Sequence, residues 1–153
     1  ALLTLENRKQ ATVNYTALEP FPVSKDIYTK LNFFERIHSE GDTFLKLHNS
    51  DWEQEVKINE KFTFYKSQER LQNFTTDKKF DIIYFDAFSP ETQPEMWTEQ
   101  ALKKCYELLD KEGFLITYCA KGVVKRTLKS IGFEVIELDG PPRKRQMTRA
   151  NKL

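Results

Sequence analysis

The sequence is poor in the residues that build metal centres and disulfide frameworks. Its 153 residues include two cysteines, two histidines and five glycines. Cys105 and Cys119 lie far apart without partners at metal-ligand spacing, which predicts reduced thiols of an intracellular protein and no metal site. No apolar run approaches the roughly 18 residues of a membrane span, and no signal-peptide pattern opens the chain. We therefore expect a cytoplasmic chain that does not enter a membrane.

A large excess of charge of either sign is also absent. Lysine and arginine number 24, and aspartate and glutamate number 23, which leaves a formal net charge of +1. This balance excludes a globally basic nucleic-acid binder but leaves room for a local basic patch. Hydrophobic residues make up 39% and aromatic residues 13% of the chain, which is long enough to bury one core. We predict a single domain over residues 1–153.

Short runs rich in β-branched and aromatic residues alternate with helical patterns. The runs predict strands over residues 11–18, 61–66, 80–85, 114–119, 133–138 and 146–151. Apolar spacings of three and four predict helices over residues 1–8, 23–37, 44–48, 68–74, 98–109 and 123–130. Such alternation is typical of an α/β sheet with helices on both faces. Only a loop joins the last two strands, so we expect an antiparallel pair at the end of a mixed, mostly parallel sheet.

Three boundaries in this scheme depend on single residues. Ser24 is the expected N-cap of the helix that includes Ile27. Gly113 is the expected stop signal after the helix that begins at Thr98, and Gly132 is expected to close the helix before it. Apart from the short helix over 44–48, residues 41–60 are expected to form a polar connection.

An acidic residue follows the central apolar run. Asp86 stands where the run 80–85 ends, and a strand of that composition suits burial on both faces. Ligands of open α/β sheets bind at the carboxyl ends of strands. Asp86, Phe88 and Pro90 therefore have the parts of a small polar site with an aromatic wall. The simpler alternative is that Asp86 only caps the next turn.

A second acidic residue, Glu19, ends the first predicted strand and precedes Pro20. A carboxylate at this place suits a ligand that offers two hydroxyl donors. The simpler alternative is a solvated acid in a turn.

Several ordered motifs resemble those of one enzyme family. They are Asp86-Ala87-Phe88-Ser89-Pro90, Pro94-Glu95-Met96-Trp97-Thr98, Thr117 to Arg126, and Gly140-Pro141-Pro142-Arg143-Lys144-Arg145-Gln146-Met147. Together they are similar to the motifs of the MnmC-like methyltransferases that depend on S-adenosylmethionine. The resemblance implies a Rossmann-like class I methyltransferase fold. The glycine-rich loop of that family is expected upstream of Ala1, so the N-terminal part of the fold is expected to be missing from this sequence.

The resemblance also implies roles for particular residues. It assigns cofactor contacts to Glu19, Pro20, Gln68, Asp86 and Ala87, with Glu19 on the ribose and Gln68 near the adenine. It assigns catalysis to Asp86, Phe88 and Pro90. It assigns substrate and tRNA contacts to Ser89, Trp97, Lys121, Arg143, Lys144 and Arg145, and Lys125, Arg126 and Arg149 are further phosphate candidates. Trp97 is expected either to pack beneath the loop or to stack on the uracil.

The implied reaction is N-methylation of 5-aminomethyl-(2-thio)uridine at the wobble position of the tRNA anticodon loop. S-Adenosylmethionine would be the cofactor, and no flavin-dependent oxidase domain resembles any part of the chain. Two other readings of the residues stay open. Glu19 would equally suit the ribose of NAD in an oxidoreductase, and a degenerate methyltransferase fold would bind RNA or a partner protein without turnover.

Overall fold

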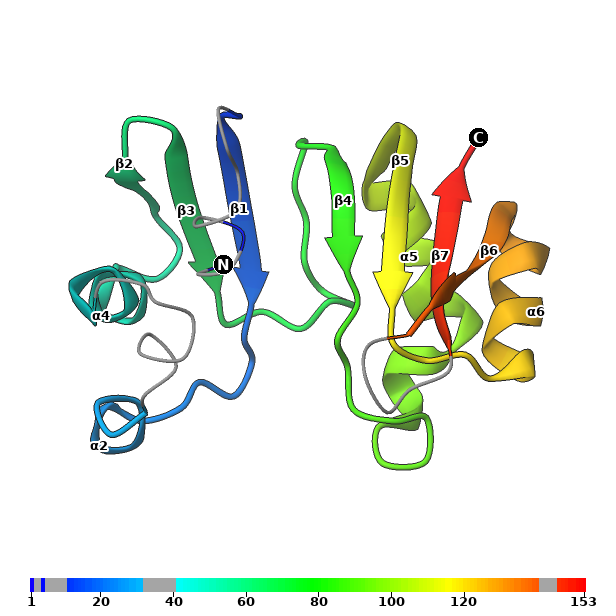
Figure 1. Ribbon diagram of the computed structural model, residues 1–153, viewed down its shortest axis with the longest axis horizontal. Coiled ribbons are helices and arrows are strands. Elements are labelled where there is room, and N and C mark those ends of the chain that lie inside the picture. Colours follow the sequence, from blue (N-terminus) through cyan, green and yellow to red (C-terminus); the bar gives the residue numbers. More distant parts are fainter. Residues whose placement is uncertain (2–3, 5–10, 32–40, 141–145) are drawn as a thin grey trace. The chain divides into compact units, whose positions relative to one another are not determined.

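The chain divides into two compact units, Ala1–Asn73 and Phe74–Leu153, in a computed structural model (Figure 1). The structure describes residues 1, 4, 11–31, 41–140 and 146–153. Most of the helix predicted over residues 1–8 lies outside the described residues. Each unit has its own β-sheet, and the two are described in turn.

The first unit is a three-stranded sheet with short helices. Its strands are β1 (Val13–Leu18), β2 (Glu55–Asn59) and β3 (Phe62–Ser67), in the order β1-β3-β2. β1 is parallel to β3, and β2 pairs antiparallel with β3. The helices are α2 (Lys25–Tyr28) and α4 (Gly41–Asn49). This confirms the strands predicted over 11–18 and 61–66 and the helix predicted over 44–48.

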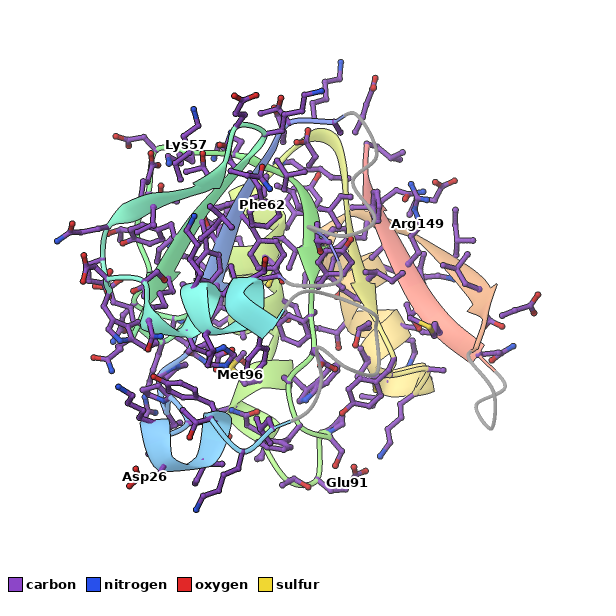
Figure 2. The ribbon with its side chains drawn as sticks, turned by 60° about the vertical axis from the view of Figure 1, so that its left-hand side comes forward. Asp26, Lys57, Phe62, Glu91, Met96 and Arg149 are labelled. Atoms are coloured by element: carbon purple, nitrogen blue, oxygen red, sulfur yellow. The ribbon has the colours of Figure 1, made fainter. Side chains whose placement is uncertain are left out.

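The core of the first unit lies between α4 and the sheet. Leu47 of α4 packs with Ile58 of β2 and with Phe62 and Phe64 of β3, all of them buried. Phe62, labelled in Figure 2, and Phe64 are two residues apart on β3, so both side chains project from the same face of the sheet. Tyr15 of β1 adds a stacked ring 6.1 Å from that of Phe62. Burial of these apolar side chains is the main stabilising term of the unit.

The second unit is a four-stranded mixed sheet. Its strands are β4 (Phe80–Tyr84), β5 (Leu109–Thr117), β6 (Phe133–Asp139) and β7 (Gln146–Lys152), in the order β4-β5-β7-β6. β4 and β5 are parallel, and β7 pairs antiparallel with both β5 and β6. The C-terminal strand β7 therefore lies between β5 and β6. The antiparallel pair predicted for the last two strands is confirmed as β6 and β7.

The connections of the second unit are helical. A 3₁₀ turn, η1 (Pro94–Trp97), leads into α5 (Glu99–Leu108), and α6 (Gly122–Ile131) follows β5. The two α-helices contact each other and the sheet (Figure 1). Thr98 caps α5 by accepting a hydrogen bond from the Ala101 N–H at 3.2 Å. Gly132 ends α6 with a φ of 115°, a left-handed conformation that favours glycine, as the sequence predicts.

The side chains between the sheet and the helices of the second unit form its core. Leu102, Leu109, Leu115, Leu128 and Ala150 are fully buried. They come from α5, β5, α6 and β7, so burial of this cluster fixes the four elements together.

Two element predictions are wrong in the first unit. Residues 68–74 form turns and bends instead of a helix, although the Ser67 hydroxyl accepts the Glu69 N–H at 3.0 Å as an N-cap would. Residues 55–59 are strand β2 instead of a polar connection. The charged residues Glu55 and Lys57 alternate there with half-buried Val56 and buried Ile58, which gives the one-sided burial of an outer strand.

The helix predicted over 23–37 also differs. Backbone bonds to the Ser24 carbonyl start α2 at the predicted N-cap, but the Ser24 side chain makes no capping bond and α2 has only four residues. Tyr28 is its buried residue, whereas Ile27 is exposed. The predicted continuation through residues 32–37 lies outside the described residues.

Two predictions for the central strands need correction. β4 is the outer strand of its sheet, and 40% of Ile82 and 55% of Tyr84 are exposed, so β4 is not buried on both faces. The helix α5 ends at Leu108, and β5 runs through the predicted stop at Gly113. A register shift in the pairing of β5 with β4 accommodates this early start of the strand.

Candidate active site

The candidate residues fall into two groups, one in each unit. The first group lies at the carboxyl ends of β1 and β3. Because these strands are parallel, their ends meet at one edge of the sheet. The Glu19 N–H donates to the Ser67 carbonyl at 2.8 Å, which extends the pairing by one residue and brings Glu19 beside Gln68. Pro20 follows and ends the ladder because it has no N–H to donate.

The carboxylate of Glu19 is exposed and makes no hydrogen bond with another described residue. Partial burial nevertheless raises the pKa of Glu19, and the positive charge of His48 opposes this shift. His48 is fixed in α4, where its Nδ1 lies 2.9 Å from the Phe44 carbonyl. The result is an acceptor with two oxygens available to a ligand.

The backbone at Gln68 is held by one carboxylate. Glu53 accepts the Gln68 N–H at 2.9 Å with Oε1 and the Tyr65 hydroxyl at 2.6 Å with Oε2. Glu53 has a φ of 57°, and its own N–H donates to the Lys66 carbonyl at 2.9 Å. The bond from Tyr65 lowers the pKa of Glu53 and raises the pKa of Tyr65. The exposed Gln68 side chain therefore projects from a fixed backbone.

The second group lies in the loop that follows β4. The Phe85 N–H donates to the Ile116 carbonyl at 2.9 Å, so strand pairing with β5 continues up to Asp86. Phe85 is buried, whereas the Asp86 side chain is exposed and makes no hydrogen bond with another described residue. Asp86 is thus a free carboxylate at the carboxyl end of a parallel strand, which is where the sequence predicts it.

Two aromatic side chains fix the loop after Asp86 from below. The Tyr118 hydroxyl donates to the Ala87 carbonyl at 2.9 Å, and the Trp97 Nε1–H donates to the Phe88 carbonyl at 2.7 Å. The Trp97 ring lies edge-to-face with Phe85 at 5.1 Å and with Tyr118 at 6.4 Å. Trp97 is buried, so it takes the first of its two expected positions and packs beneath the loop.

The outer part of the loop is closed by its own hydrogen bonds. The Phe88 N–H donates to Gln93 Oε1 at 3.1 Å. The Ser89 carbonyl accepts the N–H groups of Thr92 and Gln93 at 2.9 and 2.8 Å, and the Ser89 and Thr92 hydroxyls lie 3.1 Å apart. Ser89 therefore stabilises the turn. Pro90 and Ala87 are half-buried.

The predicted phosphate contacts are distributed unevenly. Lys121 forms an ion pair with Glu91, which lies at the outer turn of the loop and is labelled in Figure 2. Lys125 binds Glu137 Oε1 at 2.5 Å, which lowers the pKa of Glu137. Arg149 on β7 lies over the Phe114 ring with its guanidinium carbon 3.8 Å from the ring centre. Arg126 is exposed. The remaining predicted contacts, Arg143, Lys144 and Arg145, lie outside the described residues.

The sequence analysis missed three residues that hold the candidate loops. They are Glu53, Gln93 and Tyr118. Tyr118 carried a usable signal, because it directly follows β5 and the ends of parallel neighbours meet at one edge. Tyr118 also lies within the motif Thr117 to Arg126, whereas Gln93 lies between two of the motifs and in neither. Glu53 carried no such signal, since its role depends on a positive φ in a segment predicted to be a connection.

The described part of the chain has neither a metal site nor a helix that could span a membrane. No group of three or more His, Cys, Asp or Glu side chains there is placed to hold a metal ion. Both cysteines are free and buried, and burial raises the pKa of Cys105 to about 12. Among the helices of the same ranges, none combines the length and the apolar character that crossing a bilayer requires.

Comparison with known proteins identifies relatives of most of the chain. The family model described as "S-adenosyl-L-methionine-dependent methyltransferase" matches residues 22–153. The bifunctional protein MnmC of Campylobacter hominis, named for tRNA 5-methylaminomethyl-2-thiouridine biosynthesis, is 29% identical over 145 residues that cover 90% of this chain. That alignment covers 21% of the relative. Glu19 and Pro20 lie just before the range that the family model matches.

Solved structures support the fold. The crystal structure of MNMC2 from Aquifex aeolicus matches 97% of this chain and 45% of its own, with a TM-score of 0.66 at 23% identity. A methyltransferase from Pyrococcus furiosus matches 99% of this chain and 68% of its own, with a TM-score of 0.57 at 15% identity. These matches confirm the predicted class I methyltransferase fold, and the family match confirms the resemblance and the predicted cofactor. The chain spans only 10% to 23% of the length of the curated relatives that it matches.

Proposed function

The chain belongs to the S-adenosyl-L-methionine-dependent methyltransferase family, and on this premise we propose that it methylates the exocyclic amine of 5-aminomethyl-(2-thio)uridine at the tRNA wobble position. The observation that carries this proposal is the exposed Asp86 carboxylate at the end of β4, in a loop that three side chains hold in place. Similarity to an MnmC protein over 90% of the chain supports the choice of substrate.

The first group of residues fits the nucleoside part of the cofactor. Glu19 has two carboxylate oxygens that no described residue occupies, which suits the two hydroxyls of a ribose. Gln68 offers both an amide donor and an acceptor, which suits the amino group and ring nitrogens of adenine. S-Adenosylmethionine supplies an electrophilic methyl group when bound. Pro20 would add apolar contact to this part of the cofactor.

Asp86 would act on the amine of the substrate. An alkyl amine of this kind is mostly protonated at neutral pH, as a lysine side chain is, and only its neutral form has the lone pair for attack. A carboxylate that accepts a hydrogen bond from the amine orients this lone pair. The same negative charge favours the ammonium form, which opposes deprotonation. We therefore assign Asp86 to positioning the amine first and to accepting its proton second.

The remaining loop residues would shape the place where the amine is held. Phe88 and Pro90 would exclude water beside Asp86, since neither side chain has a polar atom. The Ser89 carbonyl accepts hydrogen bonds within the turn, and the Ser89 hydroxyl lies next to that of Thr92. Any contact from Ser89 to tRNA would therefore come from the outer face of the loop.

The tRNA backbone would be held by local positive charge, because the net charge of the chain is only +1. Arg126 is exposed for this role, and Lys121 would exchange Glu91 for a phosphate. Arg143, Lys144 and Arg145 complete the proposed set. Lys125 and Arg149 are already bound to Glu137 and stacked on Phe114, so we give them a lesser part. A tRNA substrate would place the enzyme in the cytoplasm.

The test is direct analysis of the modified nucleoside. Full-length protein is incubated with S-adenosylmethionine and tRNA that carries 5-aminomethyl-uridine. The tRNA is then digested, and its nucleosides are identified by mass spectrometry. The proposal predicts a gain of one methylene in that nucleoside and none in matched tRNA with unmodified uridine. A methylated base elsewhere in the tRNA would refute the substrate. Cofactor binding without any methyl transfer would favour the degenerate fold that binds RNA or a partner protein.

A further inference from the structure

The helix α6 and its N-cap carry positive charges that no acidic residue of the same segment balances. Residues 121–131 contain three lysines, one arginine and neither aspartate nor glutamate. Arg126 and Lys129 are exposed. The other two, Lys121 and Lys125, each form an ion pair with a glutamate from another part of the second unit. The two ion pairs differ in how firmly they are held.

The pair of Lys125 and Glu137 belongs to the packing of α6 on the sheet. Lys125 Nζ donates to Glu137 Oε1 at 2.5 Å, and Gln146 Nε2 donates to Glu137 Oε2 at 2.6 Å. The Lys125 side chain is only 15% exposed. Both oxygens of this carboxylate are therefore used to join α6, β6 and β7, and a ligand could take Lys125 only by breaking contacts between these elements.

The pair of Lys121 and Glu91 has no such support. The two side chains are 45% and 64% exposed. Among the residues that the structure describes, Lys121 is the one partner of the Glu91 carboxylate. The turn that carries Glu91 is closed by other groups, because the Ser89 carbonyl accepts the N–H groups of Thr92 and Gln93. An exposed ion pair adds little to folding stability, so Glu91 can leave Lys121 without opening the turn.

A carboxylate and an RNA phosphodiester offer Lys121 the same kind of contact. Each carries one negative charge and accepts hydrogen bonds through oxygen. A lysine ammonium is a compact charge with three rotatable donors, so it can exchange one anion for another without a fixed geometry. Glu91 therefore occupies the charge that a phosphate of the substrate would need.

We propose that Glu91 is an internal competitor of RNA, which occupies Lys121 in the free enzyme and is displaced by a phosphate of the bound RNA. This inference rests on the proposed function, and it names the residue that limits RNA affinity at that site. An RNA that places no phosphate near Lys121 leaves the ion pair intact and gains no contact there. Displacement would also separate the turn at Glu91, in the loop that carries Asp86, from the start of α6.

The first measurement is the affinity of the full-length protein for an anticodon stem-loop RNA with uridine at the wobble position. Glu91→Gln keeps the size of the side chain and removes its charge. It should bind this RNA about two- to fivefold more tightly at about 50 mM salt, which corresponds to ~0.4–1 kcal/mol for an exposed ion pair. The gain should shrink as the salt concentration rises to about 200 mM, because salt screens the competing pair.

Two other glutamates provide the controls. Glu107→Gln makes the same change at an exposed residue of α5 in the same unit, and it should leave RNA affinity unchanged. Glu137→Gln should lower the free energy of unfolding without tightening RNA binding, because its ion pair belongs to the packing of α6. A gain in affinity from either control equal to that from Glu91→Gln would overturn the proposal.

A double-mutant cycle separates competition for Lys121 from general repulsion of RNA by a negative charge. Lys121→Gln should weaken RNA binding. Glu91→Gln should then give no further gain in the protein that already carries Lys121→Gln, because the contested charge is gone. An equal gain from Glu91→Gln with and without Lys121 would overturn the proposal. Equal affinities of the wild type and Glu91→Gln, or no RNA binding by the wild type, would overturn it as well.

These outcomes are distinct from those of the nucleoside analysis. Methylation of 5-aminomethyl-uridine by the wild type, with no gain in affinity from Glu91→Gln, would overturn the competitor role and leave the proposed function standing. A gain that requires Lys121 would support the competitor role even if the methyl group were found on another nucleoside or on none.

Discussion

The two candidate groups occupy equivalent places in their sheets but are held by different chemistry. Each follows the carboxyl end of a strand with a parallel neighbour. At Gln68 the backbone is held by an ionised carboxylate, because Glu53 accepts bonds from Gln68 and Tyr65. After Asp86 the backbone is held by neutral groups, which are the Trp97 indole and the Tyr118 hydroxyl.

This difference separates the side chains that are proposed to bind ligands from those that hold the loops in place. Among the described residues of the loop after β4, Glu91 pairs with Lys121 at the outer turn, and the bonds to the backbone next to Asp86 come from neutral side chains, so the Asp86 carboxylate is left to meet a substrate amine. At Gln68 the supporting carboxylate is Glu53, and the exposed carboxylate of Glu19 is left for a neutral, hydroxyl-bearing ligand. The comparison predicts that low pH destabilises the loop at Gln68 and leaves the loop after Asp86 unchanged. It also predicts that substitutions at Glu19 affect cofactor binding, whereas substitutions at Asp86 affect methyl transfer.

The largest expected effect is on turnover. Asp86→Ala should lower the rate of methyl transfer about 100- to 10,000-fold, the range for removal of a group that orients or deprotonates a nucleophile. Single-turnover assays with saturating cofactor would measure it. Asp77→Ala is the control, since Asp77 is an exposed aspartate of the same unit outside the loop. Near-normal turnover in Asp86→Ala would remove Asp86 from the proposed mechanism.

A large effect on stability is expected at Gly113. A Cβ there would lie 2.9 Å from the Phe80 carbonyl oxygen and 3.1 Å from that of Asp81, so β4 would have to move. Gly113→Ala should lower the free energy of unfolding by about 1–3 kcal/mol, as overpacking does. Gly122→Ala is the matched control, because its Cβ would meet only the flexible Arg126 side chain. Equal denaturant midpoints for both variants would contradict this account of the β4–β5 pairing.

The smallest expected effect is a pH dependence of the first loop. Hydrogen bonding to Tyr65 lowers the pKa of Glu53 in the folded chain below its ordinary value of 4.5. The bond therefore stabilises the fold above pH 4.5, and this contribution is lost as the pH falls through the lowered pKa. Tyr65→Phe should lower the free energy of unfolding by less than about 1 kcal/mol at pH 7, since the site is exposed. Near pH 2 the substitution should leave the free energy of unfolding unchanged.

The neutral loop provides the contrast for that measurement. Tyr118→Phe removes a hydroxyl donor to the Ala87 carbonyl, and both groups stay neutral between pH 2 and pH 7. Its cost in unfolding free energy should be the same across this range. Urea denaturation of both variants at several pH values makes the comparison. A pH-dependent cost for Tyr118→Phe, or a constant cost for Tyr65→Phe, would contradict the assignment of ionic and neutral support.

Much of the fold could be predicted because local pattern and burial agree. The strands that begin near Val13, Phe62 and Phe133 and the antiparallel end of the chain follow from side-chain alternation and short loops. Strand β2 was missed because an outer strand with Glu55 and Lys57 on its exposed side has the composition of a loop. The end of α5 was misplaced because Gly113 is required by the close approach of β4, a tertiary contact that no local pattern reveals.

The candidate site was predictable in its exposed residues but less so in its supports. Glu19 and Asp86 stand at strand ends, where a sequence pattern can place them. Trp97 had two possible roles in the sequence, and only its burial and its bond to the Phe88 carbonyl separate them. Glu53 and Gln93 act through single hydrogen bonds to a backbone N–H, which depend on loop geometry rather than on residue pattern.

The most direct test of the account is calorimetric titration of S-adenosylmethionine into the full-length protein and its Glu19→Gln and Asp86→Ala variants, with Glu60→Gln as control. Loss of charge-assisted bonds to the ribose should weaken binding by Glu19→Gln about tenfold or more. Asp86→Ala should bind within a few-fold of the wild type, and Glu60→Gln should be unchanged. Equal affinities for wild type and Glu19→Gln, or no binding by the wild type, would contradict the division between a cofactor carboxylate and a substrate carboxylate.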